Sequence, residues 1–97
     1  MKRCIATLLT LLALSAQADY IASNGADSVR IQDAPCAESI LALIPPDARE
    51  QFRSAVANVG GKEYAACWAM LPDGTVFLQY ADGDAGMIPV SAFRPAP

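Results

Sequence analysis

Histidine is absent from the 97-residue sequence, and basic residues are few, with seven Lys and Arg against ten Asp and Glu. Histidine is the most common acid-base group near neutral pH and the most common metal ligand, so its absence disfavours most hydrolytic mechanisms and metal centres. The serines likewise have no histidine to activate them as nucleophiles. We therefore expect a protein that is not an enzyme and that uses no cofactor or metal.

The longest apolar run lies at the N-terminus. Residues 1–3 are cationic, residues 5–14 are almost wholly apolar, and residues 15–18 are small side chains of the kind that a signal peptidase reads. This order predicts a cleaved signal peptide at 1–18, followed by a single small domain at 19–97. Because the run is shorter than the roughly 20 apolar residues that span a bilayer, no transmembrane segment is expected in the mature chain. The product is expected to be exported, as a periplasmic or secreted protein.

The mature chain is expected to be acidic. Without residues 1–18 it keeps five basic and ten acidic side chains, a net side-chain charge of −5. Nucleic-acid binding depends on clustered Lys and Arg, and here the basic residues are scattered among carboxylates. The sequence therefore predicts no nucleic-acid partner.

Removal of the signal peptide would also remove Cys4 and leave two cysteines, Cys36 and Cys67. In an oxidising compartment this count predicts a disulfide between them. Closing a long loop in this way stabilises a small domain by roughly 3 to 4 kcal/mol on the chain-entropy model. A redox-active pair or a zinc site is disfavoured, because the two cysteines are far apart in sequence and no histidine completes a zinc shell.

The first half of the mature chain predicts a short strand and then a helix. Residues 28–32 place Val29 and Ile31 on one face, which is typical of a strand. Asp33 and Pro35 favour a helix start, because Asp caps exposed backbone N–H groups and Pro fits the first turn. The apolar stripe of this helix is Cys36, Ile40, Leu43 and Ile44.

A second helix is predicted over residues 46–59. Pro46 suits the first helical position, since the residue before a proline is pushed out of the helical region. The apolar positions then recur at helical spacing, at Ala48, Phe52, Ala55, Val56 and Val59. Gly60 and Gly61 are expected to end this helix.

The C-terminal half predicts strands. Residues 62–71 and 75–81 have strand length and are joined by a tight turn at 72–74, which predicts a β-hairpin. A third strand is predicted over 87–93, where Pro89 indicates an edge position or an end to the pairing.

These elements predict an α+β fold, in which two short helices pack on a small three-stranded antiparallel sheet and residues 19–25 and 94–97 are loosely held ends. Residues 83–89 read G-x-x-G-x-x-P and resemble the closing part of SH3-like barrels. That resemblance implies an alternative fold, an SH3-like small barrel with a helical N-terminal insertion, and a peptide-binding role for Pro89. The chain departs from the SH3 pattern in placing its tryptophan, Trp68, one strand early.

The predicted hairpin has one aromatic face. A three-residue loop at 72–74 pairs Met70 with Val76 and Trp68 with Leu78. The side chains on this face form the candidate interface, which is Tyr64, Trp68, Met70, Val76, Leu78 and Tyr80. Cys67 lies on the other face, so the disulfide is expected to bring the first helix there and leave the aromatic face open for binding. The alternative is that other segments cover this face and that Trp68 belongs to the core.

The function favoured by these features is that of a small exported disulfide-stabilised binding protein, such as an inhibitor, an immunity-type protein or an envelope-complex subunit. Its partner is expected to be another protein, or a second copy in a homodimer. One alternative is a self-associating structural protein. The other is a small-molecule or calcium-binding module using Asp82 and Asp84, which begin like an acidic calcium loop.

Overall fold

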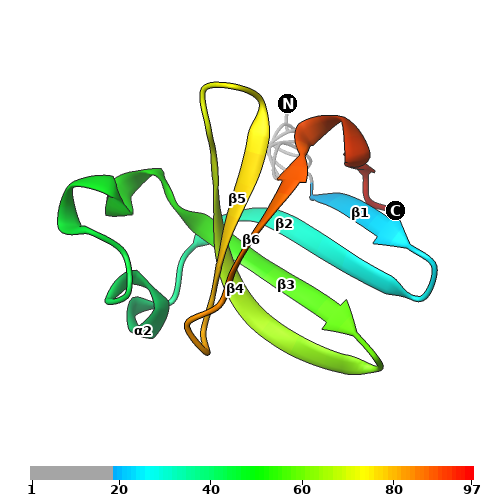
Figure 1. Ribbon diagram of the computed structural model, residues 1–97, viewed down its shortest axis with the longest axis horizontal. Coiled ribbons are helices and arrows are strands. Elements are labelled where there is room, and N and C mark those ends of the chain that lie inside the picture. The colour runs from blue at the N-terminus through cyan, green and yellow to red at the C-terminus, as the bar shows by residue number, and fades with distance from the viewer. Residues whose placement is uncertain (1–18) are drawn as a thin grey trace, which may run out of the picture.

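The computed structural model describes residues 19–97, so the predicted signal peptide at 1–18 lies outside the described residues. The chain forms one antiparallel sheet of seven strands in the order β6-β5-β4-β3-β2-β1-β7, curled into a half-barrel (Figure 1). The strands are β1 (Tyr20–Asn24), β2 (Asp27–Pro35), β3 (Arg53–Val59), β4 (Lys62–Met70), β5 (Thr75–Tyr80), β6 (Ala85–Pro89) and β7 (Arg94–Pro95). Helical structure in residues 19–97 is limited to α2 (Glu38–Leu41), η3 (Pro46–Gln51) and η4 (Val90–Ala92). Within the described part of the chain, no helix has the length and apolar character needed to cross a membrane.

The predicted α+β fold, with two helices on a three-stranded sheet, is therefore wrong. The alternative of an SH3-like small barrel with a helical N-terminal insertion is also wrong, because the segment expected to form the insertion supplies the end of β2 and all of β3. The predicted strand at 28–32 does exist, within β2. The first helix is reduced to α2, because Asp33 and Pro35 still belong to β2, where Pro35 pairs with Arg53.

The predicted helix at 46–59 is the largest error. Only η3 is helical, and β3 follows it with the alternating burial of a strand, in which Ala55 and Ala57 are buried and their neighbours are partly exposed. Gly60 and Gly61, expected to end a helix, have φ angles of 62° and 81° and form the turn between β3 and β4. Two consecutive positive φ angles are what a tight two-residue hairpin turn requires.

Both ends of the described chain are held in the sheet, against the expectation of loose ends. β1 pairs with β2 through the turn at Gly25, whose φ is 68°. β7 pairs with β1, and the Ala96 N–H donates to the Asp19 carbonyl at 2.9 Å. Asp19 also forms an ion pair with Arg30 at 3.0 Å. The two ends of the domain therefore lie side by side.

The hairpin prediction is confirmed in type and in register. Met70 pairs with Val76 and Trp68 pairs with Leu78, as a three-residue loop requires. Gly74 supplies the positive φ of 87° in that loop. The third strand is also present, but β6 ends at Pro89 and η4 replaces its second half.

The sheet has a core on each side. On the concave side, Val29, Ala57, Val76 and Leu78 belong to the main core, and Phe93 packs against it from beyond η4. On the convex side, the segment between β2 and β3 packs its apolar side chains on β4 and β5, forming a second cluster: Cys36, Ile40, Ile44, Phe52, Cys67 and Ala69.

The predicted disulfide joins this segment to the sheet. Cys36 and Cys67 are bonded, with their Cα atoms 5.6 Å apart, and Cys67 is fully buried. Ile40 and Ile44 of the predicted apolar stripe are buried as expected, whereas Leu43 is exposed. The prediction that the disulfide brings this segment onto the Cys67 face is therefore confirmed, although α2 is only one turn long.

Candidate functional site

The six candidate interface residues all lie on the concave side of the half-barrel, but they differ in exposure. Val76 and Leu78 are fully buried and offer no surface to a partner. Trp68 and Tyr80 are partly buried against the main core. Tyr64 and Met70 are exposed at the two ends of β4.

Trp68 is tied into the core by its polar atom. Its Nε1–H donates to the carbonyl of Gln32 at 2.9 Å. That carbonyl lies where the register between β2 and β3 shifts, between Ile31 and Pro35. Such irregularities leave backbone groups without a ladder partner, so the indole satisfies a carbonyl that the sheet does not. This arrangement agrees with the alternative that places Trp68 in the core.

A cavity of about 280 Å³ opens on the concave side between the two edges of the sheet. Its apolar residues come from β1, β2, β3, β6 and η4, and are Ala22, Val29, Val59, Ile88 and Ala92. Polar residues at the adjoining ends of β1 and β2 complete it, at Ser23, Asn24, Asp27 and Ser28. Pockets that combine an apolar lining with a few polar groups are typical of binding sites.

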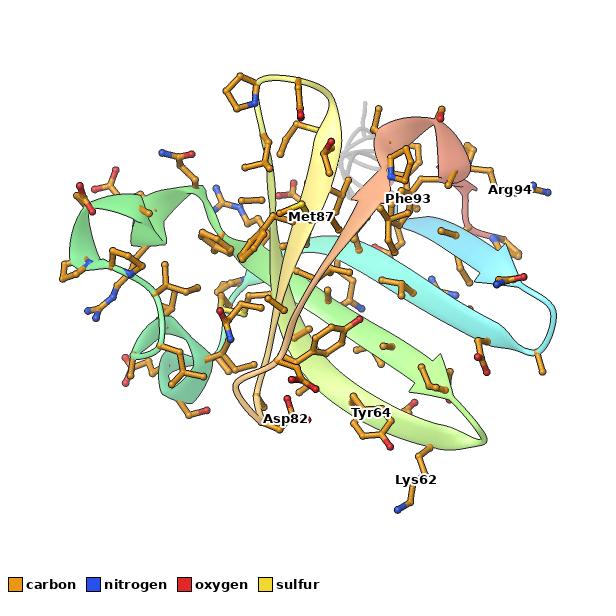
Figure 2. All side chains as sticks on the ribbon, viewed as in Figure 1. Lys62, Tyr64, Asp82, Met87, Phe93 and Arg94 are labelled. Carbon is orange, nitrogen blue, oxygen red and sulfur yellow. A yellow bond between two sulfur atoms is a disulfide. The ribbon has the colours of Figure 1, made fainter. Side chains whose placement is uncertain are left out.

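A second cavity, of about 290 Å³, adjoins the first at Val59. It is lined by Val59, Tyr64, Tyr80, Asp82, Asp84 and Ala85. Figure 2 shows Tyr64 and Asp82 at the same end of the molecule, opposite the end that holds Phe93. We refer to these two adjoining cavities together as the groove. It contains Tyr64 and Tyr80 of the predicted interface, whereas Met70 lines a separate cavity with Phe93.

Tyr80 has a perturbed phenol in this groove. Burial of its hydroxyl raises its pKa above the usual value of 10.0, and the negative charge of Asp82 adds to the effect. Both causes act in the same direction, because each disfavours the negatively charged phenolate.

This shift predicts a loss of stability in alkali. The unfolded chain releases the Tyr80 proton near pH 10, whereas the folded chain still holds it, so the unfolded state binds fewer protons and stability falls as pH rises through 10. Melting temperatures at pH 8 and pH 11 should therefore differ more for the wild type than for a Tyr80→Phe variant. An equal decline in both proteins would contradict the assignment to Tyr80.

In the acidic turn beside the groove, the Asp82 carboxylate makes a hydrogen bond within the turn itself. Asp82 accepts a hydrogen bond from the Asp84 N–H at 2.9 Å, which closes the turn around Gly83. Asp73 does the same for the Thr75 N–H at 3.0 Å. Within residues 19–97, no three His, Cys, Asp or Glu side chains are grouped so that they could hold a metal ion.

Sequence reasoning missed most of the residues that line the groove. Val59 was assigned to a helix, and Ala22 to a loose leader, so neither was placed beside Tyr64. The missed signals are Asn24 followed by Gly25, and the Gly60–Gly61 pair, because both are typical of hairpin turns and predict the strands on either side. Comparison of the chain with protein-family models, with curated proteins and with solved structures finds no match.

Proposed function

We propose that this protein is a small exported binding protein that acts by protein–protein interaction, with the groove as its binding surface. The observation that carries the proposal is the apolar groove left open between the two edges of the curled sheet. The convex side supports the same choice, since its apolar end is covered by the disulfide-linked segment. Its remaining surface, around Arg30, Gln32 and Asn58, is polar.

The exposed side chains of the groove are of the kind that protein interfaces use. Val59 is 45% exposed and Tyr64 is 39% exposed, and both line the same cavity. Tyrosine is enriched in binding patches, because its ring buries a large area while its hydroxyl keeps a hydrogen-bond partner. Export is supported by the disulfide, which persists in oxidising compartments.

Site-specific photo-crosslinking in the native cells tests this proposal. A benzophenone amino acid is placed at Tyr64, and in a matched control at Leu43, which is 48% exposed on the disulfide-linked segment. We expect a discrete protein adduct from position 64 and none from position 43. An adduct of twice the monomer mass would identify the partner as a second copy of the chain.

A second substitution tests whether the adduct at position 64 depends on the groove and not only on the exposure of that position. A Val59→Arg substitution in the Tyr64 crosslinking variant should abolish the adduct, because it places a large, positively charged side chain in the apolar lining that the two cavities share. Equal adducts at positions 64 and 43, or none at either position, would show that the groove does not bind protein.

A further inference from the structure

Within residues 19–97, the β6 strand has a free edge. Among these residues it pairs only with β5, where the Tyr80 N–H donates to Asp84 and the Val90 N–H donates to Gly74. Antiparallel ladders alternate, so a residue bonded to its partner strand is followed by one whose N–H and C=O point away. The backbone N–H and C=O groups of the even-numbered residues of β6 therefore point toward β5. Those of Ala85 and Met87 point away from β5, toward solvent, and so does the carbonyl of Pro89.

The β1 strand has a matching edge on the other side of the groove. The Ala96 N–H donates to Asp19, and Ile21 pairs with Arg94, so these positions are covered by β7. By the same alternation, the backbone N–H and C=O of Ser23 point away from β2, at the edge of the sheet just beyond the end of β7. Ser23 and Ile88 line one cavity, which places it between the two edges.

We propose that the groove receives an extended polypeptide segment, which adds to β6 as a further strand and narrows the gap toward β1. This inference rests on the proposed function and specifies its binding mode. Outward backbone donors and acceptors at two-residue spacing are what an added strand requires, because main-chain bonds hold the segment and alternate side chains enter the pocket. Neither a small apolar ligand nor a flat protein surface would use the N–H groups of Ala85 and Met87.

The charge around the groove selects a basic segment. Asp82 and Asp84 line the groove at the start of β6, and Asp27 lines it beside β1. The five residues of β6 itself carry no charge. Since edge strands are commonly protected by charged side chains, an uncharged edge with acidic residues at its start suits an uncharged strand that carries Lys or Arg at its ends.

Two substitutions at Met87 separate the contribution of its backbone N–H to binding from that of its side chain. It is 64% exposed, so its side chain contributes little to the fold. In Met87→Pro the outward N–H is lost, and an edge strand tolerates proline when that N–H faces solvent. In the matched control Met87→Ala, the N–H remains.

The probe is a capped synthetic peptide, Lys-Val-Thr-Val-Lys, titrated into the mature protein and followed by NMR of backbone amides. We expect the amides of Ala85 and Met87 to shift most. Affinity should fall about tenfold in Met87→Pro, because a backbone hydrogen bond is lost and the proline ring blocks the edge. It should change less than about threefold in Met87→Ala, where only an exposed side chain is trimmed.

Other outcomes overturn the inference. Wild-type affinity in Met87→Pro would do so, as would shifts confined to residues outside β6 and the groove, or no shifts at all. Tighter binding of a peptide with Glu in place of Lys would refute the basic character of the segment. The wild-type amide shifts test the binding mode even if Met87→Pro fails to fold. A Tyr64 adduct formed in cells alongside any of these results would leave the proposed function standing with another binding mode.

Discussion

Reduction of the Cys36–Cys67 disulfide is expected to lower the free energy of unfolding by about 3 kcal/mol, and the melting temperature by roughly 12 to 24 °C. The bond closes a loop with a sequence separation of 31 and holds the convex cluster on β4. Without it, the unfolded chain regains the freedom of that loop, and the segment between β2 and β3 is held only by apolar contacts. Thermal unfolding followed by circular dichroism, with and without reductant, measures the effect.

A matched variant separates the covalent bond from the chemistry of the reductant. Cys36→Ser should melt at about the temperature of the reduced wild type and leave Cys67 as a thiol that reacts only on unfolding, since its side chain is fully buried. An unchanged melting temperature together with two titratable thiols in the wild type unfolded without reductant would show that the pairing does not form.

Leu78→Ala is expected to destabilise the domain by about 3 kcal/mol, because it removes a buried side chain and leaves a cavity that the sheet cannot fill. Leu78 is fully buried at the centre of the concave core, beside Val76 and across from Trp68. Chemical denaturation gives the value directly. The control Met87→Ala removes a side chain of similar size from an exposed position, and should change stability by less than about 0.5 kcal/mol.

A small effect of Leu78→Ala would have a clear meaning. If the variant lost no more stability than Met87→Ala, the concave side would not be a core, and the aromatic face of the hairpin would be surface, as the interface prediction assumed. The two variants therefore test the curl of the sheet as well as one side chain.

The parts of the fold that could be predicted are those fixed by neighbouring residues. The hairpin of β4 and β5 was predicted in register, because Gly74 can adopt a positive φ and the strands on either side are uninterrupted. The disulfide followed from the two cysteines that remain once the predicted signal peptide is removed, in a chain expected in an oxidising compartment.

The segment from η3 to β3 shows why the rest could not be predicted. Phe52 and Val56 are four residues apart, a spacing that fits both a helix and one face of a strand. β3 lies between β2 and β4, so pairing on both of its edges outweighs the local preference for helix. Without knowledge of the strands that pair with it, a short apolar segment of this kind can be interpreted either as a helix or as a strand.

The candidate site depends on the curl of the sheet more than on any motif. Ala22, Val59 and Ile88 line one groove, yet they come from three strands that are distant in sequence. Tyr64 and Tyr80 could be placed on the correct face from the hairpin alone. What lies opposite them could not, since a linear pattern carries no information about how far a sheet bends.

The pairing of β7 with β1 has a consequence for local unfolding. β7 is two exposed residues long and is held at the sheet edge by β1 alone, whereas β3 is bonded on both sides. Short, solvent-exposed elements open at much lower free energy than central strands. The pairing of β7 with β1, where the two ends of the domain meet, is thus expected to open most easily. Release of β7 would extend the free edge of β1 from Ser23 back to Ile21, while the central strands remain paired.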